Sequence, residues 1–317
     1  MARVATVGLQ MLGSYKYHNI RKLAANRATL PGGPNIKLAG LNMAGVLSDW
    51  PAEIPFTERA ISALSQVKWA EKLLRRLEQA GGVIEQNIPL LFETRFAFEI
   101  HAAGSSAEYE YATGLDATTV DFRVMSDAEW FIELVSVRES KATIDASFDD
   151  GTFFGLALVG TPGEDSKASE AGEMLLVQQK IGEKVYAGKE VKFPTPVAGR
   201  FHMIVADMRG YLGGIPVVDH NDYRQIASGS YRVPDEYVQL WGDEPIKGLF
   251  EVANPLRSAS FVRDRVHFLA FTREKLYSEG ELPSIIKFFA NPHLFTGVEE
   301  ARAALSSFPV RQSKAAG

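Results

Sequence analysis

No cysteine occurs among the 317 residues of the chain. This absence excludes disulfide bonds and thiolate metal sites, so any metal ion would need oxygen or imidazole ligands. Long apolar runs are missing as well, and no stretch approaches the roughly 20 apolar residues that a membrane-spanning helix needs. The first residues also lack the charged, apolar and small-residue segments of a signal peptide. We therefore expect a cytoplasmic protein without membrane contact.

An excess of positive charge is also missing, because the formal net charge is −5. A protein that holds a long duplex through many phosphates usually has a basic stripe, so the total charge argues against that class. The charge is distributed unevenly, with basic residues dominating positions 1–50 and acidic residues abundant over 93–173. The basic N-terminal arm is typical of an ordinary solvated surface.

Periodic patterns predict the order of the elements. Helical periodicity indicates a long amphipathic helix over 57–80, ended by two glycines, and a second helix over 90–103. The other predicted elements are strands at 107–112, 118–125, 130–137, 153–159, 201–207 and 266–271 and a helix at 171–186. The central order of helix, three strands, helix and strand predicts an α/β core with a mixed sheet flanked by helices.

The same patterns divide the chain into three parts. Residues 1–84 form an N-terminal arm followed by the long amphipathic helix, and residues 85–215 form the α/β core. Residues 216–317 form a C-terminal α/β extension, which we expect to pack on the core. Apolar residues make up 46% of the chain, which is enough to bury a core of this size.

Two acidic residues lie in strands that are otherwise apolar. Because side chains alternate across a strand, Asp121 points away from the face that carries Val120 and Phe122. Glu133 lies in the apolar run WFIELVSV, where a charge is costly to bury unless it is paired or binds a metal. A hairpin turn at 126–129 joins the two strands and is expected to bring both acids together. A salt-bridged hairpin without a metal is the alternative.

The segments around these acids resemble a known enzyme superfamily. The run FETRFAFEIHAAG is followed by EYEYATGLDATTVDFRV and then by EWFIELVSV. This succession, over about residues 85–210, resembles the PD-(D/E)XK superfamily of restriction enzymes, Holliday-junction resolvases and repair nucleases. In that superfamily a helix with a Glu precedes a strand and a hairpin that carries metal-binding acids. The resemblance implies a restriction-endonuclease-like, nuclease-like core, and the order of the elements carries most of it.

The resemblance implies roles for three acids. Asp121, in VDF, and Glu133, in ELV, would bind a divalent metal. Glu93 would be the further acid on the preceding helix, with Glu99 on the same helix as its rival. The expected cofactor is Mg²⁺ or Mn²⁺, because carboxylate oxygens suit such hard cations and a phosphate can complete the coordination. The bound metal would activate a water and offset the charge that develops on the scissile phosphate.

Two positions depart from the superfamily pattern. Val120 replaces the usual proline, which has little consequence. Val135 replaces the lysine of the (D/E)-X-K motif, whose ammonium would stabilise the attacking hydroxide and the phosphate. Unless another cation replaces it, a loss of about 10²–10⁴-fold in rate is expected by analogy with the removal of one acid–base group.

Some members of the superfamily supply this lysine from the next helix. Here Lys180 and Lys184 lie one turn apart on the predicted helix that follows the hairpin. We prefer Lys180, because the neighbouring Gln178 and Gln179 could add a hydrogen bond to phosphate. Gly182 between the lysines lowers helix propensity by about 1 kcal/mol relative to Ala, which indicates a close approach of another element at this point.

The leading functional hypothesis is a metal-dependent phosphodiester hydrolase, a nuclease that acts on DNA or RNA. The alternative is a catalytically inactive nuclease-fold module that binds nucleic acid or a protein partner, which Val135 and the negative net charge favour. A scaffold without a nucleic-acid role is a third reading. The segment at 219–222 (DHND) contains one histidine and is more typical of Asx turns than of a metal site.

Overall fold

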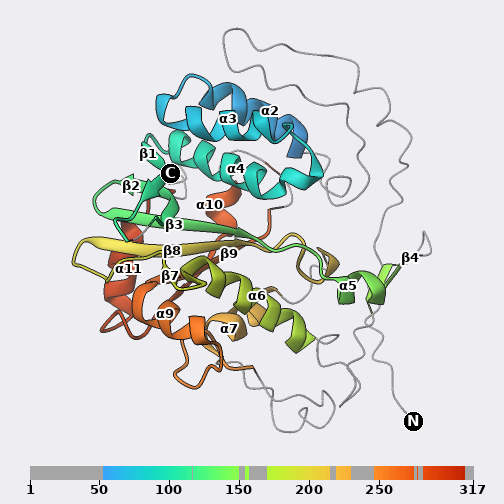
Figure 1. Ribbon diagram of the computed structural model, residues 1–317, viewed down its shortest axis with the longest axis vertical. Coiled ribbons are helices and arrows are strands. Elements are labelled where there is room, and N and C mark those ends of the chain that lie inside the picture. Colours follow the sequence, from blue (N-terminus) through green and yellow to red (C-terminus); the bar gives the residue numbers. More distant parts are fainter. Residues whose placement is uncertain are drawn as a thin grey trace, which may run out of the picture.

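The computed structural model describes residues 53–115, 117–149, 154–156, 170–214, 219–229, 246–274, 277 and 281–310. The basic arm lies outside the described residues. The described elements form an α/β fold in which one six-stranded mixed sheet lies between two layers of helices (Figure 1). Among them, no helix combines the length and the apolar character needed to cross a bilayer.

The central sheet has the strand order β1-β2-β3-β8-β9-β10. The first three strands form an antiparallel meander, β8 lies parallel to β3, β9 lies parallel to β8, and β10 returns antiparallel to β9. Their bounds are Ala107–Ala112, Thr119–Met125, Glu129–Ser136, Arg200–Asp207, Phe268–Thr272 and Lys287–Ala290. The expected mixed sheet is thus confirmed, and the part of the chain after residue 215 extends it with two strands.

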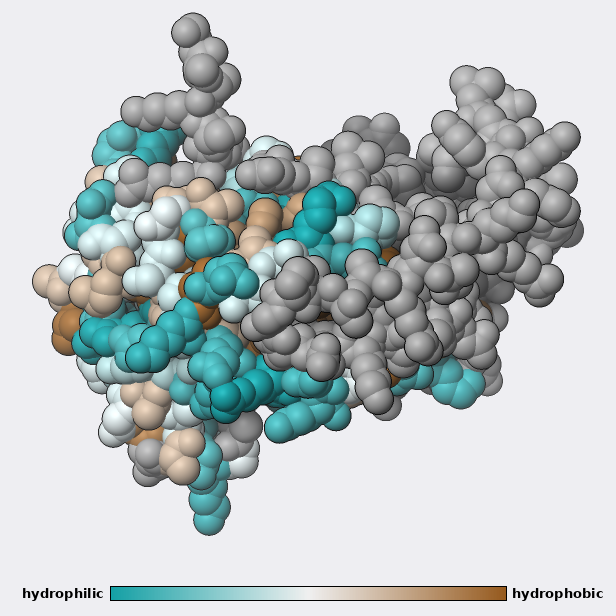
Figure 2. Space-filling model, turned by 90° about the horizontal axis from the view of Figure 1, so that it is seen from above, coloured by the Kyte–Doolittle hydropathy of each residue, from teal (hydrophilic) through white to brown (hydrophobic). Residues whose placement is uncertain are grey.

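Helices cover both faces of the sheet (Figure 1). The upper layer in this view consists of α2 (Glu53–Leu64), α3 (Glu71–Gln79) and α4 (Ile88–Ala102), and the lower layer consists of α6 (Glu170–Val185), α7 (Asp219–Ser228) and α9 (Arg257–Arg265). The smaller elements are α5 (Lys141–Ala146), α10 (Glu281–Ile285), α11 (Val298–Ser306) and the hairpins Ser147–Asp149 with Phe154–Leu156 (β4, β5) and Tyr186–Ala187 with Glu190–Val191 (β6, β7). Seen from above, the described surface is mainly hydrophilic, with only small hydrophobic areas (Figure 2).

The prediction of one long helix over 57–80 is wrong. Helix α2 ends at Leu64, and α3 begins at Glu71 after a single 3-10 turn. Val67 between them has an extended backbone, with φ −111° and ψ 111°. A continuous helix of this span would be about 36 Å long and would run past the 15 residues of α4. The break instead allows both helices to pack on α4, with Leu64 and Leu77 fully buried.

The other central helices agree with their predicted ranges. Helix α4 covers Ile88–Ala102 and α6 covers Glu170–Val185, each within two residues of the expected bounds. The segment at 219–222 begins α7 and does not form a turn. The expected succession of helix, three strands, helix and strand therefore occurs as α4, β1, β2, β3, α6 and β8, with only short elements inserted.

Helix α6 is held between the sheet and α9. Its residues Val177, Ile181 and Val185 are buried in the apolar cluster under the sheet. Gly182 lies against Ser258 of α9, so closely that a Cβ added at the glycine would lie 2.7 Å from the Ser258 Cβ. The close approach that the glycine suggested is confirmed, and it determines how deeply α6 packs.

Gly182→Ala is expected to lower the free energy of unfolding by about 1 kcal/mol. Overpacking against Ser258 costs about 1–3 kcal/mol, whereas the gain in helix propensity is only about 1 kcal/mol. In a Ser258→Gly background the same substitution should instead stabilise the protein. Urea denaturation of the four proteins in this cycle measures both effects. Equal destabilisation in the two backgrounds would contradict the contact.

Candidate functional site

The candidate site lies where β2 separates from β3. The two strands pair from Met125–Glu129 to Phe122–Ile132, and the ladder stops there. At the next position, side-chain carboxylates replace the backbone hydrogen bonds between the strands. The backbone N–H of Asp121 donates to Glu133 Oε2 at 3.3 Å, and the N–H of Leu134 donates to Asp121 Oδ2 at 2.7 Å. The structure thus brings the two predicted acids together on adjacent antiparallel strands.

The backbone on the other side of Asp121 is also distorted. Strand β1 pairs with β2 at Tyr109–Phe122 and at Tyr111–Val120, but Glu110 between these pairs has a φ of 49°. A residue other than glycine in this left-handed region costs about 1–3 kcal/mol and persists only where its surroundings hold it. The Glu110 carboxylate is held by Lys72 at 2.7 Å and by Arg76 at 2.8 Å.

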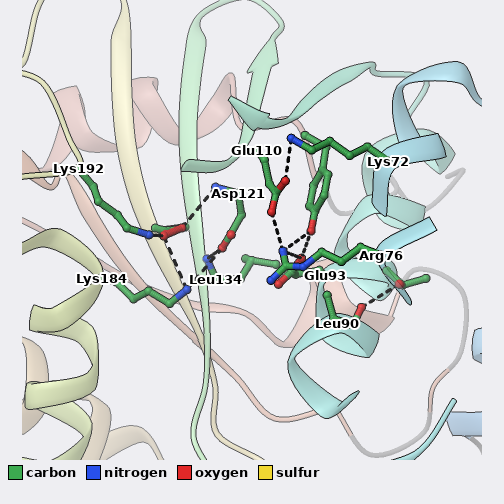
Figure 3. A network of polar contacts seen from close by, with 12 residues as sticks. Lys72, Arg76, Leu90, Glu93, Glu110, Asp121, Leu134, Lys184 and Lys192 are labelled. Carbon is green, nitrogen blue, oxygen red and sulfur yellow. Dashed lines mark hydrogen bonds and ion pairs between the residues drawn. The ribbon is translucent and has the colours of Figure 1, made fainter. Parts of the chain in front are cut away.

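Two lysines face the acid pair from the α6 side (Figure 3). The Lys184 ammonium lies 3.9 Å from Asp121 Oδ2 and 3.7 Å from Glu133 Oε1, so one cation is shared by both acids. Lys192, which follows β7, forms a closer ion pair with Glu133. The prediction that Lys180 rather than Lys184 faces the acids is wrong, because Lys184 is the lysine that reaches the carboxylates.

Glu93 lies on the opposite side of Asp121 from the two lysines (Figure 3). Its Oε2 accepts a hydrogen bond from the Tyr109 hydroxyl at 2.5 Å and lies 3.7 Å from Arg76, which also donates to the Tyr109 oxygen at 2.7 Å. Its rival Glu99 instead pairs with the buried Arg95. Of the two acids on α4, Glu93 therefore belongs to the site.

Burial and mutual repulsion raise the pKa values of two of the acids. Burial and the neighbouring Asp121 raise the pKa of the fully buried Glu133 to about 8, although Lys184 and Lys192 oppose the shift. Burial and Asp121 also raise the pKa of Glu93 to about 7, against Tyr109 and Arg76. Burial lowers the pKa of Lys184, but the three acids outweigh this effect and place it above its usual value.

Carboxylate oxygens are the ligands that a hard divalent cation such as Mg²⁺ prefers. Asp121 and Glu133 present carboxylate oxygens to one position, which the Lys184 ammonium now holds. Among the described residues, no group of three His, Asp or Glu side chains is arranged to hold one ion. A metal here would thus have two protein carboxylates, with water and phosphate completing its coordination.

Several residues of the site were not identified from sequence. Lys192 reaches Glu133 because the β6–β7 hairpin turns the chain back over the sheet, and the glycine-containing turn after α6 was its only local signal. Tyr109 is buried in the apolar core, yet its hydroxyl connects Glu93 with Arg76. Gln178 does not face the site, because its amide donates to backbone oxygens of Ile226 and Lys247.

No protein-family model, no curated protein and no solved structure matches this chain. What the site does must therefore be argued from its own residues and geometry.

The stability of the wild-type protein is expected to fall relative to Glu133→Gln as the pH rises from about 4.5 to about 8. The folded protein binds the Glu133 proton more tightly than the unfolded chain does. The stability gained from this group is therefore fully present below the pKa that Glu133 has in the unfolded chain. It is lost as the pH rises through the pKa of Glu133 in the folded protein. The difference should reach the order of a few kcal/mol. Urea denaturation of both proteins over this range measures it, and parallel pH profiles would contradict the raised pKa.

Proposed function

We propose that the protein is a Mg²⁺-dependent phosphodiester hydrolase that cleaves DNA or RNA. The observation that carries the proposal is the shared cation position: two carboxylates at the separation of β2 and β3 face one ammonium delivered by α6. The core order of α4, β1, β2, β3, α6 and β8 supports it, since it is the order implied by the resemblance to the PD-(D/E)XK superfamily.

The residues of the site would have separate tasks. Asp121 and Glu133 would hold the metal, which when bound lowers the pKa of a coordinated water and offsets charge on the phosphate. Lys184 is positioned to stabilise the attacking hydroxide or the phosphate, so it would replace the lysine that is absent at Val135. Glu93 would act on the opposite side of Asp121, where its raised pKa suits exchange of a proton near neutral pH.

Addition of Mg²⁺ or Mn²⁺ is expected to raise the melting temperature. A ligand that binds only the folded state stabilises it by about 1.4 kcal/mol when its free concentration is ten times the Kd, which corresponds to a shift of a few degrees. The shift should disappear in Glu133→Gln, which keeps the shape of the side chain and removes its charge. Differential scanning calorimetry measures both, and an unchanged shift in the variant would place the metal elsewhere.

Cleavage of DNA or RNA is expected in the presence of Mg²⁺ and should be abolished by Asp121→Ala. Lys184→Met should reduce the rate about 10²–10⁴-fold, because it removes one group that acts on the reacting atoms. Lys189→Met is the matched control, since Lys189 is exposed in the turn between β6 and β7. Equal rates for Lys184→Met and Lys189→Met, measured on labelled DNA and RNA substrates, would remove Lys184 from the mechanism.

A second candidate is a catalytically inactive module of the same fold that binds nucleic acid or a protein. The observation in its favour is that Glu133 is already paired with Lys192 and accepts the backbone N–H of Asp121, so the acids could serve only as a buried ion-pair cluster. This candidate predicts no metal-dependent thermal shift and no cleavage, and the two measurements above therefore distinguish it from the hydrolase.

A further inference from the structure

A cleft of about 320 Å³ opens beside the acid pair, between α4 and α6. Its floor is the edge of β3 at residues 134–136, beyond the last pair of the β2–β3 ladder. Glu93 borders it from α4, and Lys180 and Lys184 border it from α6. The volume is at the lower end of the range of about 300–1,000 Å³ that is usual for small-molecule sites.

Two hydrogen-bond donors of this cleft have no partner among the described residues. Ser136 Oγ is buried and makes no hydrogen bond. Lys180 is half-buried, and within the described part of the chain its ammonium forms neither a hydrogen bond nor an ion pair. Buried polar groups are nearly always paired, so the Ser136 hydroxyl indicates that the cleft has a ligand, and the half-buried Lys180 ammonium is available to bind the same ligand.

The burial of Lys180 in the cleft favours an anion as this ligand. Burial lowers the pKa of Lys180, and the nearby Arg138 lowers it further, against Glu173 and Glu183. Glu173 also accepts a hydrogen bond from the Ser140 hydroxyl. Because Glu173 and Glu183 do not outweigh the effect of burial, an anion beside Lys180 would further stabilise its charged form, as phosphate commonly does for a lysine.

We infer that the cleft is a phosphate-binding subsite, in which Lys180 and Ser136 hold a phosphate group next to the one that Asp121, Glu133 and Lys184 would engage. Lys180 and Lys184 are four residues apart, or about 6 Å along the helix, so the two ammoniums can serve two different phosphates. That the ligand is a nucleic-acid strand rests on the proposed function, whereas the affinity for phosphate does not.

The test compares Lys180→Met and Ser136→Ala with the exposed control Lys189→Met. Calorimetric titration with inorganic phosphate, without metal, should show about tenfold weaker binding for Lys180→Met, weaker binding for Ser136→Ala, and unchanged binding for Lys189→Met. Ser136→Ala removes only a hydroxyl without a described partner, so its melting temperature should not fall. This variant keeps the test valid if Lys180→Met is poorly folded.

A second arm uses a fluorescein-labelled oligothymidylate of 20 nucleotides, with anisotropy measured over a salt series in EDTA. Loss of one phosphate contact should reduce the slope of log K against log salt by about 0.7 for Lys180→Met. In cleavage assays Lys180→Met should have a higher KM and a nearly unchanged kcat, since the lost contact stabilises the bound substrate and the transition state equally.

The outcomes separate this inference from the proposed function. Phosphate binding that depends on Lys180 and Ser136, in a protein that cleaves neither DNA nor RNA, would support the subsite and overturn the hydrolase. Metal-dependent cleavage with unaltered phosphate and oligonucleotide binding in both variants would support the hydrolase and overturn the subsite. Binding of free phosphate without a change in the oligonucleotide salt slope would also overturn it as a strand contact.

Discussion

The Glu133 carboxylate is fully buried, and the surrounding elements are arranged to meet its charge. Removing an ion from water costs several kcal/mol unless partners replace the lost solvation. Those partners come from separate elements: a backbone amide of β2, one lysine of α6, and a second lysine after β7. The separation of β2 from β3 makes room for this carboxylate, and it also creates the open strand edge that floors the adjoining cleft.

The network also joins the two helical layers through the gap between the strands (Figure 3). On one side α6 approaches Asp121, and on the other side α3 and α4 contribute Arg76 and Glu93, which Tyr109 of β1 connects. The left-handed backbone of Glu110 turns its carboxylate toward the Arg76 guanidinium. Backbone strain and charges of both signs are thus concentrated around Asp121, a pattern that is common at functional sites.

The closeness of Asp121 and Glu133 was predictable, because the short turn that joins their strands is a local property. The strict alternation expected around Asp121 is wrong, because Val120 lies in the core cluster of Phe131, whereas Phe122 lies in the other cluster. The choice between Lys180 and Lys184 was not predictable, because the depth and rotation of α6 depend on its contact with Ser258, which is distant in sequence. The break near Val67 likewise depends on packing against α4 and has no strong local signal. Lys192 was missed for a similar reason, since a hairpin rather than a motif places it.

The contact between Gly182 and Ser258 has a consequence for the modular organisation of the chain. The lysines of α6 are positioned by α9, and β9 completes the hydrogen bonding of β8, so the half of the molecule that carries the acid pair and the last third share one cooperative unit. A fragment that ended near residue 215 would leave the β8 edge unpaired and uncover the apolar underside of α6. Insertions or fusions are better tolerated at loop tips away from the contact of α6 with α9 and of β8 with β9 than at the boundary between core and extension.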